Sequence, residues 1–152
     1  MEPSFRGLDD YLGFWLRRLS DTVAARLEQD LAEYGVTVSQ WDVLISIYRQ
    51  DAVTAQDVAA LMDINPSAVS RLVDRLEAKK LLARKADPRS RRRLLLVLTD
   101  EGTALIPRLS AAVDRHDKHF FGDLDDSQRA ELKERLVGLL LRSREQNADD
   151  GR

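Results

Sequence analysis

Apolar residues recur every three or four positions along most of this chain, the spacing typical of amphipathic helices. It predicts one long helix over residues 8–34, which Gly35 ends. Further helices are expected at about 39–50, 58–62, from Pro66 to the late seventies, at 100–120, and from 125 onward, with a frayed tail at 147–152. Ser39, Thr54 and Thr99 are the expected helix caps, and Pro107 predicts a bend or an irregular first turn.

One segment departs from the helical spacing. Residues 82–86 and 93–98 form two strand-like runs, and Asp, Pro and Ser in the intervening segment 87–92 favour a turn. The expected fold class is therefore mainly α with a small β-hairpin.

The helix that begins at Pro66 has the clearest start in the chain. Asn65 suits the cap, and proline suits the first helical position because no intrahelical partner is needed there for its missing N–H. Apolar residues at i, i+3, i+4 and i+7 predict one packed face: Val69, Leu72, Val73 and Leu76. The opposite face is polar and free to contact a partner: Ser67, Ser70, Arg71 and Asp74.

Charge is concentrated around this helix and the hairpin. Residues 65–93 hold ten basic and three acidic residues, a net charge of +7 in a chain of −2. Such asymmetry indicates a phosphate-facing surface. Within it, Arg89, Arg91, Arg92 and Arg93 repel one another, and phosphates would relieve that repulsion. The alternatives are a solubilising loop tip and, for Arg71 and Arg75, ordinary surface ion pairs with Asp74 and with Glu77 or Glu101.

Long apolar helices at both ends of the chain need a surface to cover them. They could cover each other, but packing against a second copy is more economical in a chain of 152 residues. A homodimer would also hold two such basic modules a fixed distance apart, which suits half-sites about 10 base pairs, or a multiple, apart on a twofold-symmetric DNA duplex.

Composition excludes several classes of site. Without cysteine the chain has no disulfide, thiolate zinc site or thiol switch, and His116 and His119 lack a third strong ligand, so we expect no metal. No phosphate-binding loop, Gly-rich dinucleotide turn or cysteine nucleophile recommends an enzyme, and no cofactor is expected. No apolar run could span a bilayer, and Met1–Ser4 lack signal-peptide character, so we expect a cytoplasmic protein without membrane contact.

Four stretches, in this order and spacing, resemble the multiple antibiotic resistance regulator (MarR) family of bacterial transcription factors. They are residues 36–44, residues 58–62 with 66–77, residues 87–92, and residues 98–102, and the resemblance extends over about 8–144. It implies a winged helix-turn-helix dimer with an N-terminal dimerisation helix at 1–35, a DNA-binding domain at 36–99 and C-terminal dimerisation helices at 100–146.

The resemblance also implies roles for residues. The helix from Pro66 would enter the major groove, with Ser67, Ser70, Arg71 and Arg75 as DNA contacts. Arg91 would add to the positive charge of the hairpin tip. Asp87, Arg89 and Arg92 match the family's wing motif, in which an arginine enters the minor groove and the aspartate braces an arginine. The chain departs from that motif at Ser90, where a second aspartate is common.

A small aromatic or anionic effector is likewise implied, in a pocket between the dimerisation and DNA-binding lobes. Trp15 and Arg18 are candidates as an aromatic wall and a cation on neighbouring helical turns, with Ile47 and His116 as further lining. The plainer interpretation makes Trp15 dimer core and Arg18 a surface charge.

The expected function is a ligand-released repressor on double-stranded DNA, and the competing one is a winged-helix module that docks other proteins.

Overall fold

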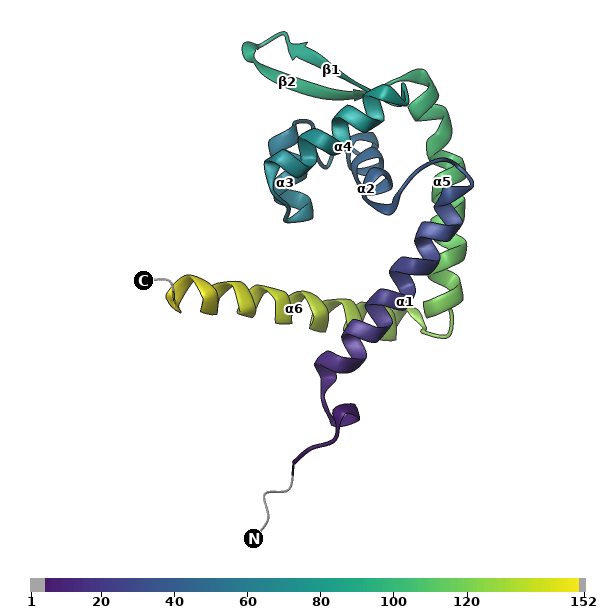
Figure 1. The fold of residues 1–152 in the computed structure, drawn as a ribbon, viewed down its shortest axis with the longest axis vertical. Coiled ribbons are helices and arrows are strands. Elements are labelled where there is room, and N and C mark those ends of the chain that lie inside the picture. Colours follow the sequence, from purple (N-terminus) through teal and green to yellow (C-terminus); the bar gives the residue numbers. More distant parts are fainter. Residues whose placement is uncertain (1–4, 151–152) are drawn as a thin grey trace. The chain divides into compact units, whose positions relative to one another are not determined.

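The computed structural model describes residues 5–150 as six α-helices and one antiparallel hairpin (Figure 1). In chain order the elements are a 3₁₀ turn at Leu8–Asp10, α1 (Leu12–Ala32), α2 (Val38–Tyr48), α3 (Ala55–Met62), α4 (Pro66–Ala78), β1 (Leu82–Asp87), β2 (Ser90–Leu98), α5 (Asp100–Phe121) and α6 (Asp126–Asp150). The expected fold class, mainly α with a small hairpin, is confirmed. No helix in this range is long and apolar enough to cross a bilayer.

The chain divides into two compact units. The first extends to His116 and holds α1 to α4, the hairpin and most of α5, whereas the second holds the end of α5 and α6. The boundary lies within α5, so the predicted borders of the dimerisation and DNA-binding parts at residues 35 and 99 remain predictions.

The hydrophobic core of the first unit forms where α4 packs against its neighbours. Val69, Val73 and Leu76 of α4 have no solvent exposure, as the apolar spacing predicted, while Leu72 is half-buried at the edge of that face. They share the core with buried residues from five other elements: Leu31, Val43, Leu44, Val58, Leu82 and Leu109. The position of α4 is thus determined by one face, and its polar face lies at the surface.

Three helix starts confirm the predicted caps. Thr54 caps α3, its hydroxyl oxygen accepting the Asp57 N–H at 3.1 Å, and Asn65 caps α4 with proline at the next position. At α5, Thr99 Oγ1 accepts the Gly102 N–H at 3.0 Å. These caps lie where a short polar side chain precedes a helical run, a pattern that needs no tertiary contact.

The cap of α2 was predicted two residues too late. Thr37, not Ser39, caps this helix, because its hydroxyl oxygen accepts the Gln40 N–H while the Gln40 side chain accepts the Thr37 N–H. Thr-x-x-Gln satisfies the capping-box pattern as well as Ser-x-x-Asp does. The helix also ends at Tyr48, two residues earlier than expected, and Gln50 then adopts a left-handed φ of 61°.

The predicted helix over 8–34 is interrupted near its start. A 3₁₀ turn is followed by extended backbone at Tyr11, and only then does α1 begin. The Asp10 carboxylate accepts the Gly7 N–H, and the Trp15 indole N–H donates to the Asp9 carbonyl at 2.8 Å. That carbonyl therefore has a partner other than the backbone N–H that a continuous helix would supply.

The C-terminal helix is longer than predicted. α6 continues to Asp150, so residues 147–150 of the expected frayed tail are helical, and residues 151–152 lie outside the described residues. No glycine or proline stands between Gly138 and residue 151, so nothing in the sequence breaks the helix there. Pro107 lies inside α5, as the eighth residue of that helix.

The hairpin has a shorter turn than the predicted segment 87–92. β1 pairs with β2 from Leu82 opposite Leu98 to Asp87 opposite Ser90, with an irregularity after Ala86. Only two residues remain for the turn, because the Asp87 side chain accepts the Arg89 N–H at 2.9 Å and closes it locally.

The junction between hairpin and α5 is tightly packed. Thr99 donates its N–H to the Leu81 carbonyl and its hydroxyl to the Lys80 carbonyl. A Cβ on Gly102 would lie 2.0 Å from the Leu81 carbonyl oxygen, so only glycine fits here. The base of the hairpin and the start of α5 are therefore held against the turn that follows α4.

We expect Gly102→Ala to lower the free energy of unfolding by about 1–3 kcal/mol, because the added methyl group must displace backbone. Urea unfolding of the parent and the variant measures this. Gly13→Ala is the matched control, since its Cβ would meet only the end of the Arg17 side chain at 3.4 Å. A Gly102→Ala variant as stable as the Gly13→Ala control would contradict the tight junction.

Asp42 on α2 provides a pH-dependent prediction. Burial raises the pKa of its carboxyl group above the usual value, and the negative charge of Glu28 raises it further. The folded state therefore binds the Asp42 proton more tightly than the unfolded state does. The stability gained from this proton is complete below the unfolded-state pKa and is lost as the pH rises through the pKa of the folded state. We expect Asp42→Asn to be more stable than the parent at pH 7, with the difference vanishing below about pH 4. Urea unfolding at both pH values tests this, and a destabilised variant at pH 7 would contradict it.

Candidate nucleic-acid interface

The first turn of α4 is organised by its cap. The Asn65 side-chain oxygen accepts both the Ser67 N–H and the Ser67 hydroxyl, each at 2.8 Å. The Ser67 hydroxyl proton is thus committed to the cap, and its oxygen remains available as an acceptor at the exposed helix start.

The predicted contact residues of α4 lie at the surface. Ser67, Ser70, Arg71 and Arg75 are all exposed. Within residues 5–150 neither arginine has an ion-pair partner within 4.0 Å. The alternative in which they pair with Asp74 and Glu77 does not occur, because Arg84 holds both carboxylates. Two unpaired guanidinium groups therefore face solvent on one helix.

The hairpin tip, residues 87–92, is organised around a buried acid. Asp87 is 8% exposed; one carboxylate oxygen accepts the Arg89 N–H, and the other lies 3.6 Å from Arg93 Nη1. The aspartate therefore braces an arginine, and that arginine is Arg93 at the base of the tip. Arg89, Arg91 and Arg92 are exposed, with no ion pair in the described part of the chain.

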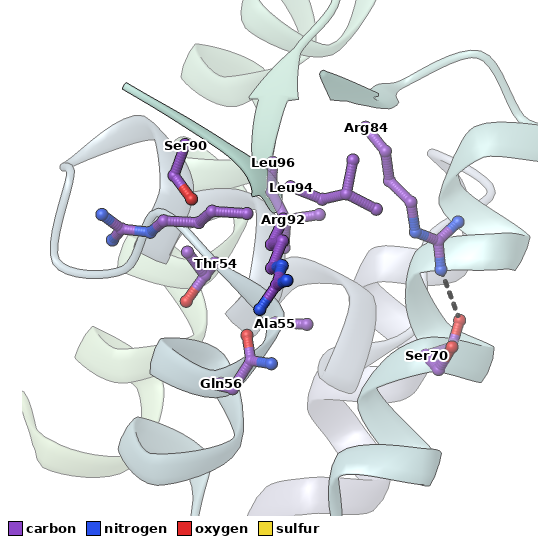
Figure 2. A pocket seen from close by; sticks show the side chains of 10 residues that line it. Thr54, Ala55, Gln56, Ser70, Arg84, Ser90, Arg92, Leu94 and Leu96 are labelled. Carbon is purple, nitrogen blue, oxygen red and sulfur yellow. Dashed lines mark hydrogen bonds between the residues drawn. The ribbon is translucent and has the colours of Figure 1, made fainter. Parts of the chain in front are cut away.

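A groove of about 580 Å³ lies between α4, the start of α3 and the hairpin (Figure 2). The first turn of α3, one residue of α4 and the two strands line it: Thr54, Ala55, Gln56, Ser70, Arg84, Ser90, Arg92, Arg93, Leu94 and Leu96. Three arginines and no acidic residue line this groove, but Arg84 and Arg93 are paired with carboxylates outside it. Arg92 is therefore the lining arginine that has no ion pair in the described part of the chain.

The segment before α3 ties the hairpin to the helices. The Leu96 N–H donates to the Val53 carbonyl at 2.9 Å, so β2 is hydrogen-bonded on both sides. Asp57 accepts the N–H groups of Val53 and Thr54. The Val53 bond is the largest cause that holds its pKa below the usual value, with further contributions from Thr54 and the Arg93 charge. The apolar run in Arg93–Leu98 indicates a strand but not this third partner.

Arg84 is the interface residue that sequence reasoning missed. It lies two positions after buried Leu82 on β1 and contacts three residues of α4. Strand alternation could have placed it on the inner face with Leu82, but its basic character grouped it with the solvent-facing arginines.

The four candidate ligand residues have different surroundings. Trp15 is half-exposed, and the Arg18 guanidinium lies over it at 5.8 Å and over Phe14 at 5.5 Å. Ile47 is buried in the core. His116 is also buried, its Nε2 2.9 Å from the Val23 carbonyl oxygen. Trp15 and Arg18 thus lie together, whereas Ile47 and His116 are enclosed by neighbouring side chains.

The chain is similar in sequence to known transcriptional regulators. Residues 34–93 match a sequence model of the MarR family. A putative transcriptional regulatory protein for the hcr operon of Thauera aromatica is 31% identical over 139 residues, which cover 91% of this chain and 81% of that protein. The chain belongs to the MarR family. The matched region holds α2 to α4 and most of the hairpin, the elements that carry the exposed arginines.

Solved structures of MarR-type regulators share the fold. CouR from Rhodococcus jostii RHA1, bound to p-coumaroyl-CoA, is 31% identical with a TM-score of 0.82, covering 89% of this chain and 95% of that one. The S. aureus MepR–DNA complex is 25% identical with a TM-score of 0.78, covering 87% and 96%. The winged helix-turn-helix assignment is thereby confirmed.

Proposed function

We propose that this MarR-family regulator binds operator DNA as a homodimer, with α4 in the major groove and the hairpin tip against the minor groove. The contact residues would be Ser67, Ser70, Arg71 and Arg75 on α4, and Arg89, Arg91 and Arg92 on the tip, with Asp87 holding the turn. The two sets lie on one compact unit, so a single duplex could meet both.

This proposal rests mainly on the exposed arginines of α4 and the tip, which are not neutralised by ion pairs within the described part of the chain. Exposed arginines on α4 and on the tip have no acidic partner among residues 5–150, although the segment also contains acidic side chains. Unpaired cations that share one surface repel each other in the free protein. Phosphates neutralise them on binding and release counterions, which makes the affinity salt-dependent.

Exposed apolar residues support the dimer. On α1, Leu12, Leu16 and Leu19 are 47–80% exposed, and on α6 Leu132, Leu136, Leu139 and Leu140 are 40–63% exposed. Leucines on one side of a helix gain free energy when a second surface removes them from water. A second copy supplies that surface and places two α4 helices on a twofold-symmetric site.

The most direct regulatory action of such a dimer is repression by occupying the operator. A small aromatic or anionic effector would release it by favouring a state in which the two α4 helices no longer match the half-sites. CouR, with its bound p-coumaroyl-CoA, gives this chemistry a precedent in a relative. We propose no catalytic role, and a cytoplasmic location follows from the DNA partner.

The first experiment is fluorescence anisotropy of the protein on DNA that flanks its own gene, against scrambled DNA, over a salt series. We expect sequence-selective binding with a steep salt dependence. If DNA affinity depends on neither sequence nor salt concentration, and α4 and the hairpin capture a protein partner, the results would instead support a protein-docking module.

In the same assay, Arg89→Ala should weaken binding and reduce the slope of log affinity against log salt by about two, because the homodimer loses one phosphate contact in each subunit. Arg49→Ala is the matched control, because Arg49 is exposed and already paired with Asp51. Equal affinities and slopes for Arg89→Ala and the parent would remove the tip from the interface.

For the effector, we expect a panel of aromatic carboxylates and their CoA thioesters to contain a compound that lowers operator affinity and changes tryptophan fluorescence. Arg18→Ala should weaken binding of that compound about tenfold, the size of a lost charge-assisted hydrogen bond. Trp15→Phe identifies which tryptophan reports the change, since Trp41 is the other one. Unchanged binding to Arg18→Ala would place the ligand elsewhere.

A further inference from the structure

Arg84 differs from the exposed Arg71, Arg75, Arg89, Arg91 and Arg92 because two carboxylates of its own chain engage its charge. We propose that Arg84 is a positioning residue of the DNA interface, which holds the hairpin at a fixed distance and angle from α4 and does not itself contact DNA. This inference rests on the proposed DNA-binding function.

Arg84 joins β1 to three positions of α4. Its Nη1 lies 2.8 Å from Glu77 Oε2, and its Nη2 lies 2.9 Å from Asp74 Oδ1 and 3.3 Å from the Ser70 carbonyl oxygen. Its backbone N–H also donates to Glu77 Oε1 at 2.9 Å. Both oxygens of Glu77 are thus engaged by one residue, through its side chain and its main chain. Figure 2 shows the bond from Arg84 to Ser70 at one side of the groove.

The direction of this side chain follows from the strand. Arg84 shares a face of β1 with buried Leu82 and lies opposite buried Leu96. Its side chain is 26% exposed, less than the neighbouring ion-paired Arg93 at 51%. Its inward direction is therefore set by the alternation of the strand, and α4 supplies the acceptors.

The charge balance argues against a phosphate contact. One guanidinium with two carboxylates leaves the Arg84, Asp74 and Glu77 cluster at −1, so this cluster repels a phosphate at its surface. The tip arginines carry the opposite charge, and no carboxylate within 4.0 Å neutralises Arg89, Arg91 or Arg92 in the described part of the chain. The two groups of arginines therefore have different tasks.

The anchoring points explain the need for such a contact. The hairpin is held at its base by Thr99 and Gly102 and on its β2 side by the bond from Leu96 to Val53, but the tip lies beyond these anchors at Pro88 and Arg89. Arg84 lies on β1 between the base of the hairpin and its turn. Its contacts on α4 are Ser70 and, four and seven residues further along the helix, Asp74 and Glu77. A hairpin that pivots on its base must break them, and it would then change the distance between the major-groove and minor-groove contacts.

The decisive variant is Glu77→Gln, because electrostatics and positioning predict opposite results. Removing a negative charge beside the DNA surface should tighten binding on charge alone. We expect instead that Glu77→Gln and Arg84→Ala each weaken operator binding about tenfold. The double variant should be no weaker than Arg84→Ala, since the two residues act as one unit. Arg84→Lys should restore little, because an ammonium group lacks the planar fork that engages both carboxylates.

The matched control is Glu101→Gln, an exposed acid with no ion pair in residues 5–150. Its operator affinity should stay equal or rise. Urea unfolding confirms that every variant is folded under the binding conditions. Additive losses in the double variant, or full rescue by Arg84→Lys, would make Arg84 a direct phosphate contact and overturn the proposal.

A DNA-free measurement separates this inference from the proposed function. The chain has no cysteine, so Ala78→Cys on α4 and Arg91→Cys on the tip allow two spin labels at chosen positions. Labelled protein is mixed with excess unlabelled protein, and double electron–electron resonance gives the distance distribution within one chain. We expect Arg84→Ala and Glu77→Gln to broaden it and Glu101→Gln to leave it unchanged.

An unchanged distribution in Arg84→Ala would overturn the positioning role whatever the DNA assay shows. A broadened distribution together with a parent protein that fails to select its operator would overturn the proposed function while leaving Arg84 as the residue that orders the hairpin. A broadened distribution with undiminished operator affinity would show that the order has no part in DNA binding, and would overturn the proposal.

Discussion

The complete burial of one face of α4 is the constraint on which the rest of the interface depends. Val69, Val73 and Leu76 have no exposure, and each is surrounded by side chains from other elements of the first unit. A buried aliphatic side chain contributes about 1.5–3 kcal/mol, so rotating the helix would cost more than any surface contact could return. The buried face therefore fixes the direction of the polar face. Ser70, Arg71 and Arg75 are exposed because of the orientation of the helix, and they need no side-chain contacts of their own to keep them at the surface.

The hairpin depends on the same packing through a second set of contacts. Leu82 and Leu96 enter the core, the Leu96 N–H reaches the Val53 carbonyl, and the Thr99 and Gly102 junction closes against the turn after α4. Each contact joins the hairpin to a different part of the helical frame. Helix and hairpin therefore form one unit, which suits a protein that must meet two grooves of a duplex at once.

The basic segment, residues 65–93, contains two groups of arginines: those paired with acids and those exposed without an ion pair to any described residue. Asp87 and Glu77 are the least exposed acids of the segment, and each holds one arginine, Arg93 and Arg84 respectively. The arginines further out remain unpaired and available. An acid inside a basic segment thus does not oppose DNA binding, because it sets the shape of the surface from which the remaining cations project. The Ser90 departure from the family's wing motif fits this division, since Asp87 alone secures both the turn and Arg93.

Local patterns in the sequence are enough to specify the helices and strands and their order. Helices, the Asn65-Pro66 start, the Thr54 and Thr99 caps, the hairpin and the excess of positive charge are all local properties, because periodicity and capping act within about one turn of helix. Where two local patterns competed, as Thr37 and Ser39 did for α2, local reasoning chose the wrong one. The tertiary structure decided which charges are paired and which are free. Arg84 and Arg92 look alike in sequence, and only the approach of α4 to β1 gives one of them two carboxylates. The pairing of Arg84 depends on α4 residues that lie seven to fourteen positions before it in the chain, on a different element. Helix or strand periodicity predicts contacts within one element and does not predict contacts of this kind.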